Sequence, residues 1–273
     1  MKKVVGLLAI LFTAAFLPAV SANQKPAIAI LDTAVDTTKV DIAYEVCIME
    51  EKRCPNKQSF MEGTGAATMI NPVNGFEHGT HMSAIAQKVN PNMNIIFIRI
   101  VPATNSGTLG IYTDNTINEA MKWVIANKTK FNIVATSISF GSNRFTKKGH
   151  YCPVNQNLRN TIVTLQSMGV ASLFAAGNRY DKTRVDYPAC ISEAVAVGSV
   201  GERGNVENYS NSGAELDFYT LGTHDVLNRR VMGTSGATAA LAALWAKSYQ
   251  GSYQVTYDYI KSLSQQLVVP LLS

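Results

Sequence analysis

The sequence predicts an α/β fold with three layers, in which a mostly parallel central sheet is flanked by helices. Apolar segments of strand length alternate along the chain with longer segments of helical periodicity, as in folds built from repeated strand-helix units. The first such segment, Ala27–Leu31, is apolar at every position, which is typical of a strand buried on both faces of a sheet. The chain of 273 residues is also long enough to form one sizeable core.

The expected elements follow in chain order. Strands are predicted at 27–32, 94–101, 131–139, 170–176 and 193–200, and helices at 78–88, 114–128, 155–168, 235–250 and 253–264. The helix at 114–128 has the most distinct start, because capping residues after Thr113 precede an apolar face at Ile117, Met121 and Val124. The Ala- and Leu-rich run Gly236–Lys247 predicts a buried helix.

Three short motifs carry the residue types that nucleophilic acyl transfer requires. Asp32 lies in Ile-Leu-Asp-Thr-Ala-Val-Asp, His78 in His-Gly-Thr-His, and Ser235 in Gly-Thr-Ser-Gly-Ala-Thr. A neutral serine attacks a carbonyl poorly until a neighbouring imidazole removes its proton, and a carboxylate orients that imidazole. We therefore take Asp32, His78 and Ser235 as candidate catalytic residues.

Each candidate also has a structural interpretation. Asp32 ends a predicted strand, where open α/β sheets place their active sites, but it is also compatible with an ordinary turn. His78 is three residues before His81, so the two share a helical face and a metal pair is an alternative, although no third ligand lies at a familiar spacing. Ser235 precedes an apolar helix and can act as a helix cap, a role that is compatible with catalysis.

The order Asp, His, Ser and the residues around each motif resemble the subtilisin-like serine proteases, the subtilase family. Three more segments match that family in the expected order: Ser-Ile-Ser-Phe-Gly at 137–141, Phe-Ala-Ala-Gly-Asn at 174–178 and Tyr-Ser-Asn-Ser-Gly at 209–213. The resemblance implies a subtilisin-like fold, an Asp32–His78–Ser235 triad and an exported serine endopeptidase that forms an acyl-enzyme intermediate. It also implies that Asn178 donates to the oxyanion.

The resemblance further implies that substrate binds between two segments. Ser139, Phe140 and Gly141 are expected to add an extended peptide as a strand, and Ala175, Ala176 and Gly177 to form the opposite wall of the pocket for the residue before the scissile bond. The small residues of the second wall predict room for a large apolar side chain, since neither segment contains an acidic residue that would select Lys or Arg.

The N-terminal residues predict export. Residues 1–22 combine Lys2 and Lys3, an apolar stretch and a small-residue end at Ala22, as in a secretory signal peptide. Residues 23–273 are then expected to form a single catalytic domain in the periplasm or outside the cell. Only nine residues separate Ala22 from Asp32, where secreted subtilases carry an inhibitory pro-domain, so a separate folding partner or inhibitor is a further possibility.

Cysteine content and charge agree with this assignment. The four cysteines of an exported chain predict two disulfides, for which three pairings are possible, and their even number disfavours free thiols or a metal site. Cys47 is close enough in sequence to Cys54 to close a short loop, and Cys152 would then pair with Cys190. The formal net charge of +5, two units of which belong to the predicted signal peptide, is too small to indicate binding to nucleic acid or to a membrane surface. We expect a peptide or protein substrate, with no metal and no cofactor.

Two other functions remain compatible with the sequence. A relative with weak or no catalytic activity would keep the fold as a secreted binding protein. A peptide-bond transferase would use the same acyl-enzyme, because an amine can intercept that intermediate in place of water.

Overall fold

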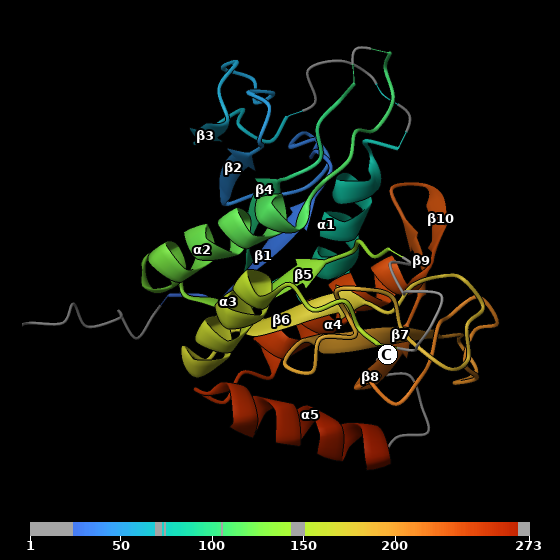
Figure 1. Ribbon diagram of the computed structural model, residues 1–273. Coiled ribbons are helices and arrows are strands. Elements are labelled where there is room, and N and C mark those ends of the chain that lie inside the picture. Colours follow the sequence, from blue (N-terminus) through green and yellow to red (C-terminus); the bar gives the residue numbers. More distant parts are fainter. Residues whose placement is uncertain (1–23, 69–72, 74, 105, 143–150, 267–273) are drawn as a thin grey trace, which may run out of the picture.

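The computed structural model describes residues 24–68, 73, 75–104, 106–142 and 151–266 (Figure 1). The predicted signal peptide, residues 1–22, lies outside the described residues. The structure has an eight-stranded sheet in the order β3-β2-β4-β1-β5-β6-β7-β8, and every strand pairs in parallel except β3, which is antiparallel at the edge. The predicted mostly parallel sheet is confirmed.

The bounds of the elements are as follows. The sheet consists of β1 (Ala27–Asp32), β2 (Tyr44–Ile48), β3 (Phe60–Glu62), β4 (Asn94–Arg99), β5 (Ile133–Ile138), β6 (Ala171–Ala175), β7 (Val195–Val200) and β8 (Phe218–Leu221). A separate antiparallel ribbon contains β9 (Thr223–Val226) and β10 (Arg229–Met232). The helices are α1 (His78–Val89), α2 (Asp114–Phe131), α3 (Gln156–Ser167), α4 (Thr234–Lys247) and α5 (Tyr253–Gln266).

Helices cover both faces of the sheet, with α2 and α3 on one face and α1 and α4 on the other (Figure 1). The side chains of β1 alternate between these layers. Ile28 and Ile30 pack in the core that contains α1 and α4, whereas Ala27, Ala29 and Leu31 pack in the core that contains α2 and α3. Burial on both faces explains why this strand is apolar at every position.

Helix α4 lies under the centre of the sheet. Its buried residues are not confined to one stripe, and they include Leu241 and Trp245. A helix that is apolar all round is stable only when it is enclosed. The enclosed position fixes the N-terminus of α4, which carries Ser235 in its first turn.

The predicted capping of α2 is present. The Thr113 hydroxyl oxygen accepts a hydrogen bond of 3.1 Å from the N–H of Thr116, and the helix ends at Asn132 in the left-handed conformation with φ 54°.

Several short strands were absent from the sequence prediction, namely β2, β3, β8, β9 and β10. Strand β2 illustrates the reason, because the polar residue Glu45 interrupts its apolar pattern. Glu45 is buried and its carboxylate accepts hydrogen bonds of 2.9 Å from the N–H groups of Gly65 and Ala67. These partners come from a loop distant in sequence, so the local pattern alone does not indicate a strand.

Two disulfides are formed, Cys47–Cys54 and Cys152–Cys190. The first joins β2 to the loop that precedes β3, and the second joins the segment before α3 to the segment before β7. Within the described ranges, no helix combines the length and the apolar character needed to cross a membrane.

The two disulfides should differ in their effect on stability. They close loops with sequence separations of 38 and 7 residues, for which the chain-entropy model gives about 4 and about 2 kcal/mol. We expect the Cys152→Ala/Cys190→Ala variant to lose more free energy of unfolding in urea than the Cys47→Ala/Cys54→Ala variant. The reverse order would contradict the entropic account, and a Cys47–Cys152 peptide in a non-reduced digest would contradict the pairing itself.

Candidate active site

The predicted catalytic residues are brought to one edge of the sheet. Asp32 is the last residue of β1, His78 is the first residue of α1, and Ser235 is in the first turn of α4. Ser139 directly follows β5, the neighbour of β1 in the sheet. Because β1, β5 and β6 are parallel, their carboxyl ends meet at this edge.

Asp32 and His78 form a direct hydrogen-bonded pair. The Nδ1 atom of His78 lies 2.8 Å from Oδ1 and 3.1 Å from Oδ2 of Asp32, which is fully buried. Oδ1 also accepts a hydrogen bond of 2.7 Å from the N–H of Thr33. Since the ionised carboxylate only accepts, Nδ1 of His78 must carry the proton, and Nε2 of a neutral ring is then free to act as a base.

Electrostatics at His78 favour its protonated form. Burial lowers the pKa of His78, but the attraction of Asp32, its hydrogen bond and the charge of Glu77 outweigh burial and raise the pKa above that of an ordinary imidazole. The side chain remains 32% exposed, so the ring is accessible from solvent. A base of this kind can take up a proton near neutral pH.

The Ser235 hydroxyl is hydrogen-bonded to the residue that follows β5. Ser235 Oγ donates to the carbonyl oxygen of Ser139 at 3.2 Å, and Ser139 Oγ donates to the carbonyl oxygen of Ser235 at 3.2 Å. Among the described residues, Ser235 and His78 share no hydrogen bond. Catalytic hydrogen bonds are often long or absent before substrate binds, so the missing contact does not by itself exclude Ser235 as a candidate nucleophile.

Asn178 is held against the start of α4. Its Oδ1 atom accepts hydrogen bonds from the N–H of Thr234 at 2.9 Å and from Thr234 Oγ1 at 3.0 Å. A backbone N–H can only donate, so the oxygen of the amide faces the helix and the NH₂ group is left as a donor beside Ser235. The position of Gly233 permits this contact, because it adopts φ 142° and a Cβ there would lie 3.2 Å from Asn178 Nδ2.

The predicted substrate-binding residues that follow β5 include a short stretch whose backbone groups are not hydrogen-bonded within the described residues. Ser139 bonds to Ser235, and Ser142 pairs with Tyr187 through hydrogen bonds of 2.8 and 3.1 Å. Between them, the backbone groups of Phe140 and Gly141 have no hydrogen-bond partner in the described part of the chain. The Phe140 ring lies 5.9 Å from the His78 ring, measured between centroids.

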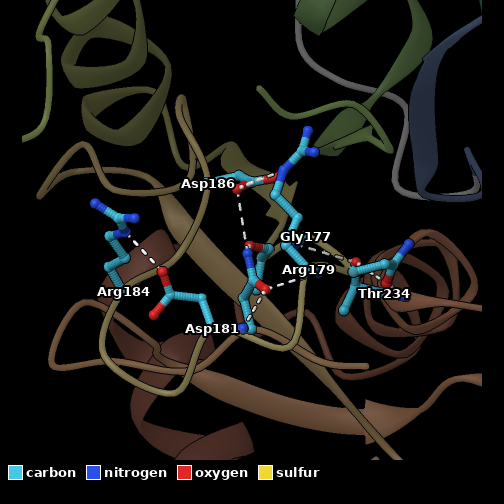
Figure 2. A network of polar contacts seen from close by, with 9 residues as sticks. Gly177, Arg179, Asp181, Arg184, Asp186 and Thr234 are labelled. Carbon is cyan, nitrogen blue, oxygen red and sulfur yellow. Dashed lines mark hydrogen bonds and ion pairs between the residues drawn. The ribbon is translucent and has the colours of Figure 1, made fainter. Parts of the chain in front are cut away.

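The opposite segment, Ala175–Gly177, is buried, and the side chains of Thr234 and Asn211 bond to it; Thr234 Oγ1 accepts from the N–H of Gly177 at 3.2 Å (Figure 2). The Nδ2 atom of Asn211 donates to the Ala176 carbonyl oxygen and to Asp186 Oδ1, both at 3.1 Å. Its Oδ1 atom accepts from the N–H groups of Arg179 at 2.9 Å and Asp181 at 3.2 Å. Asn211 thus fixes the loop that presents Asn178.

The structure also places an acidic residue between the two predicted substrate-binding segments. Asp186 Cβ lies 3.0 Å from a Cβ built on Gly141, and a Cβ on Gly177 would clash with the Asp186 carboxylate. Arg179 Nε donates to both carboxylate oxygens, at 3.2 and 3.0 Å (Figure 2). Burial raises the pKa of Asp186 more than Arg179 and Asn211 lower it.

Neither segment contains an acidic residue, but the structure packs Asp186 against both of them, which their sequences did not indicate. Asp186 follows β6 by a loop, and nothing in its local sequence indicates that it returns to this site. Thr234 lies in the Ser235 motif, but its sequence does not indicate that its side chain and N–H bond to Asn178. These residues were missed because their roles depend on contacts across the loops and not on a motif.

A metal pair at His78 and His81 is the alternative that the sequence raises for these histidines. In the residues that the structure describes, no group of three or more His, Cys, Asp or Glu side chains is arranged to hold a metal ion. His81, the possible partner of His78, has its pKa lowered by burial first and by neighbouring positive charges, while Glu77 opposes this shift.

Comparison with solved structures agrees with this arrangement. A cold adapted subtilisin-like serine proteinase superimposes with a TM-score of 0.64 at 19% identity, over 89% of this chain and 84% of that one. A lanthipeptide protease gives a TM-score of 0.63 at 16% identity, over 86% and 79% of the two chains. These similarities establish a subtilisin-like fold.

The sequence comparisons establish the family. The profile of the subtilase family matches residues 23–266, and the chain belongs to this family. An alkaline proteinase from Hapsidospora chrysogena is 29% identical over 191 residues, covering 65% of this chain and 43% of that protein. The minor extracellular protease Epr of Bacillus subtilis is 27% identical over 184 residues, covering 62% and 26%. This chain thus spans less than half the length of these two curated relatives.

The network around Asn211 makes its amide a predicted determinant of stability. Removal of the side chain in Asn211→Ala leaves buried groups unpaired, at a cost of about 1–3 kcal/mol for each group that finds no water. We expect Asn211→Ala to lower the free energy of unfolding in urea by at least that amount. The exposed Asn208 is a matched control, and an Asn211→Ala variant as stable as Asn208→Ala would contradict this role.

Proposed function

We propose that this chain is an exported serine endopeptidase that cleaves peptide bonds in peptides or proteins. The observation that supports this most strongly is the 2.8 Å contact between Asp32 and His78 beside the start of α4, where Ser235 lies next to an anchored Asn178. Membership of the subtilase family and two disulfides compatible with an oxidising compartment agree with it.

The proposed mechanism follows from the positions of these residues. Ser235 rotates away from the Ser139 carbonyl, gives its proton to Nε2 of His78 and attacks the peptide carbonyl. Asp32 keeps the proton on Nδ1 and stabilises the imidazolium without taking the proton. The Asn178 NH₂ group and the N–H of Ser235, in the first turn of α4, then stabilise the oxyanion. His78 returns the proton to the leaving amine, and water hydrolyses the acyl-enzyme.

The bound peptide would extend the sheet. The free backbone groups of Phe140 and Gly141 are suited to pair with an extended substrate strand. Hydrogen bonds from the main chain would position the scissile bond above Ser235 for any sequence.

Labelling with a fluorophosphonate tests the function directly. The purified chain without residues 1–22 should form a covalent adduct at Ser235, detected by mass spectrometry, and Ser235→Ala should form none. A secreted binding protein with the same fold would not label. Cleavage of a peptide in the presence of an added amine would distinguish hydrolysis from transfer, because a transferase should yield mainly the amide product.

The rate of labelling should depend on the protonation of His78. Because only the neutral imidazole accepts the serine proton, the rate should rise with pH through the His78 pKa, which Asp32 holds above the ordinary value near 6.5. In Asp32→Asn the midpoint should shift to lower pH, since the raising charge is lost, and the plateau should fall by on the order of 10⁴. An unchanged midpoint would contradict the role of Asp32.

Replacement of Asn178 should affect turnover more than binding. Loss of one oxyanion donor lowers kcat about 10²–10³-fold, a magnitude established for subtilisin itself, a member of this family. We expect Asn178→Ala to show such a fall in kcat with little change in KM. Asn208→Ala, at an exposed position, is the control, and equal kcat values in wild type and Asn178→Ala would exclude the assignment.

A further inference from the structure

Arg179 and Asp186 form an ion pair at the predicted substrate-binding segments, and the proposed mechanism does not use it (Figure 2). Asp186 touches the positions of both Gly141 and Gly177, so it lies between the two segments that are expected to enclose the substrate side chain. Arg179 immediately follows Asn178. Because Arg179 bonds to Asp186, which borders both segments, a substrate side chain enclosed by these segments would lie near the Arg179 guanidinium.

The exposed member of the pair is the cation. The Arg179 side chain is 49% exposed, whereas that of Asp186 is 5% exposed. The Asp186 carboxylate already accepts hydrogen bonds from Arg179 Nε and from Asn211 Nδ2. Arg179 uses only Nε for this pair, and its two terminal nitrogens have no partner among the described residues. The site thus presents unused donors and a positive charge, while its negative charge is covered.

We propose that Arg179 makes this enzyme selective for an acidic residue, Glu or Asp, on the acyl side of the scissile bond, and that Asp186 positions Arg179 for this contact. The proposal rests on the proposed function. A substrate carboxylate matches the two terminal nitrogens of a guanidinium, which bind carboxylates in a planar, two-point geometry.

Other side chains fit this site less well. A Lys or Arg side chain would meet the exposed guanidinium as a like charge, and it would have to displace Arg179 to reach Asp186. A large apolar side chain would cover the Arg179 donors without satisfying them, which carries a desolvation cost. The ion pair therefore discriminates against both the basic and the apolar classes of substrate.

Cleavage of a peptide library tests this selectivity. The library varies only the residue before the scissile bond among Glu, Asp, Gln, Leu and Lys. We expect kcat/KM for Glu or Asp to exceed that for Leu and Lys by roughly ten- to a hundredfold, the range for a hydrogen bond to a charged group. Ser235-dependent cleavage mainly after Leu or Lys would overturn the proposal and leave the proposed function intact.

Substitution of Arg179 should change the preference in a way that a structural role would not. In Arg179→Gln the carboxylate of Asp186 is uncovered, so we expect the acidic preference to disappear and cleavage after Lys to increase at alkaline pH. Arg184→Gln is the matched control, because Arg184 lies on the same loop and pairs with Asp181, pointing away from Asp186 (Figure 2). A preference that changes equally in both variants would overturn the role of Arg179.

A second variant covers the case in which Arg179→Gln leaves an unpaired buried charge and fails to fold. The double variant Arg179→Gln/Asp186→Asn removes both charges but keeps hydrogen-bonding groups at both positions, and circular dichroism would verify its fold. It should lose the preference for Glu without gaining one for Lys. Retention of the Glu preference would contradict the proposal.

A binding measurement separates this inference from the proposed function. Ser235→Ala should bind the uncleaved Glu peptide about tenfold or more tightly than the Leu and Lys peptides, as measured by fluorescence anisotropy. If wild type cleaves nothing but this preference in binding is present, the endopeptidase function fails, and only the recognition of an acidic side chain by Arg179 stands. If Ser235→Ala shows no preference for Glu, the inference fails, whether or not wild type cleaves.

Discussion

The parallel pairing of β1, β5 and β6 is the constraint on which the rest of the site depends. It directs the carboxyl ends of these strands to one edge, where Asp32, Ser139 and the Ala175–Gly177 segment end their strands or follow them. The helices that supply His78 and Ser235 begin at the same edge. Both helices pack on the face of the sheet opposite to α2 and α3. The strand order therefore brings together residues that are far apart in sequence and belong to separate motifs.

A second layer of buried polar contacts refines this arrangement. The amide of Asn211 satisfies four groups of the loop after β6, and Thr234 fixes the Asn178 amide from the α4 side. Each partner is a backbone group or a charge that would be costly to bury alone. The same contacts that stabilise the loop orient the proposed oxyanion donor, so stability and function depend on the same side chains here.

The contacts of the proposed triad are only partly formed in this structure. Asp32 and His78 are already bonded, whereas the Ser235 hydroxyl donates to the Ser139 carbonyl. That carbonyl belongs to the segment on which we expect the substrate to bind as a strand. A substrate strand paired with Phe140 and Gly141 would lie next to the Ser139 carbonyl oxygen, which accepts the hydrogen bond from Ser235. Peptide binding would thus be connected to the orientation of the Ser235 hydroxyl.

The sequence by itself determined the fold class, the strands that form the centre of the sheet and the helices. The apolar periodicity and the capping residues of these elements are local features of the sequence. Because both faces of β1 are buried, this strand is apolar at every position instead of alternating. The sequence also determined which residues are candidates for the triad, since Asp32, His78 and Ser235 lie in ordered motifs. Only the tertiary structure decided the short strands such as β2, whose Glu45 finds its partners in a distant loop. It also decided that Asp186 packs against the predicted substrate-binding segments and bonds to Arg179. These features depend on how loops pack against one another, and no local pattern encodes a contact whose partners are set by the fold.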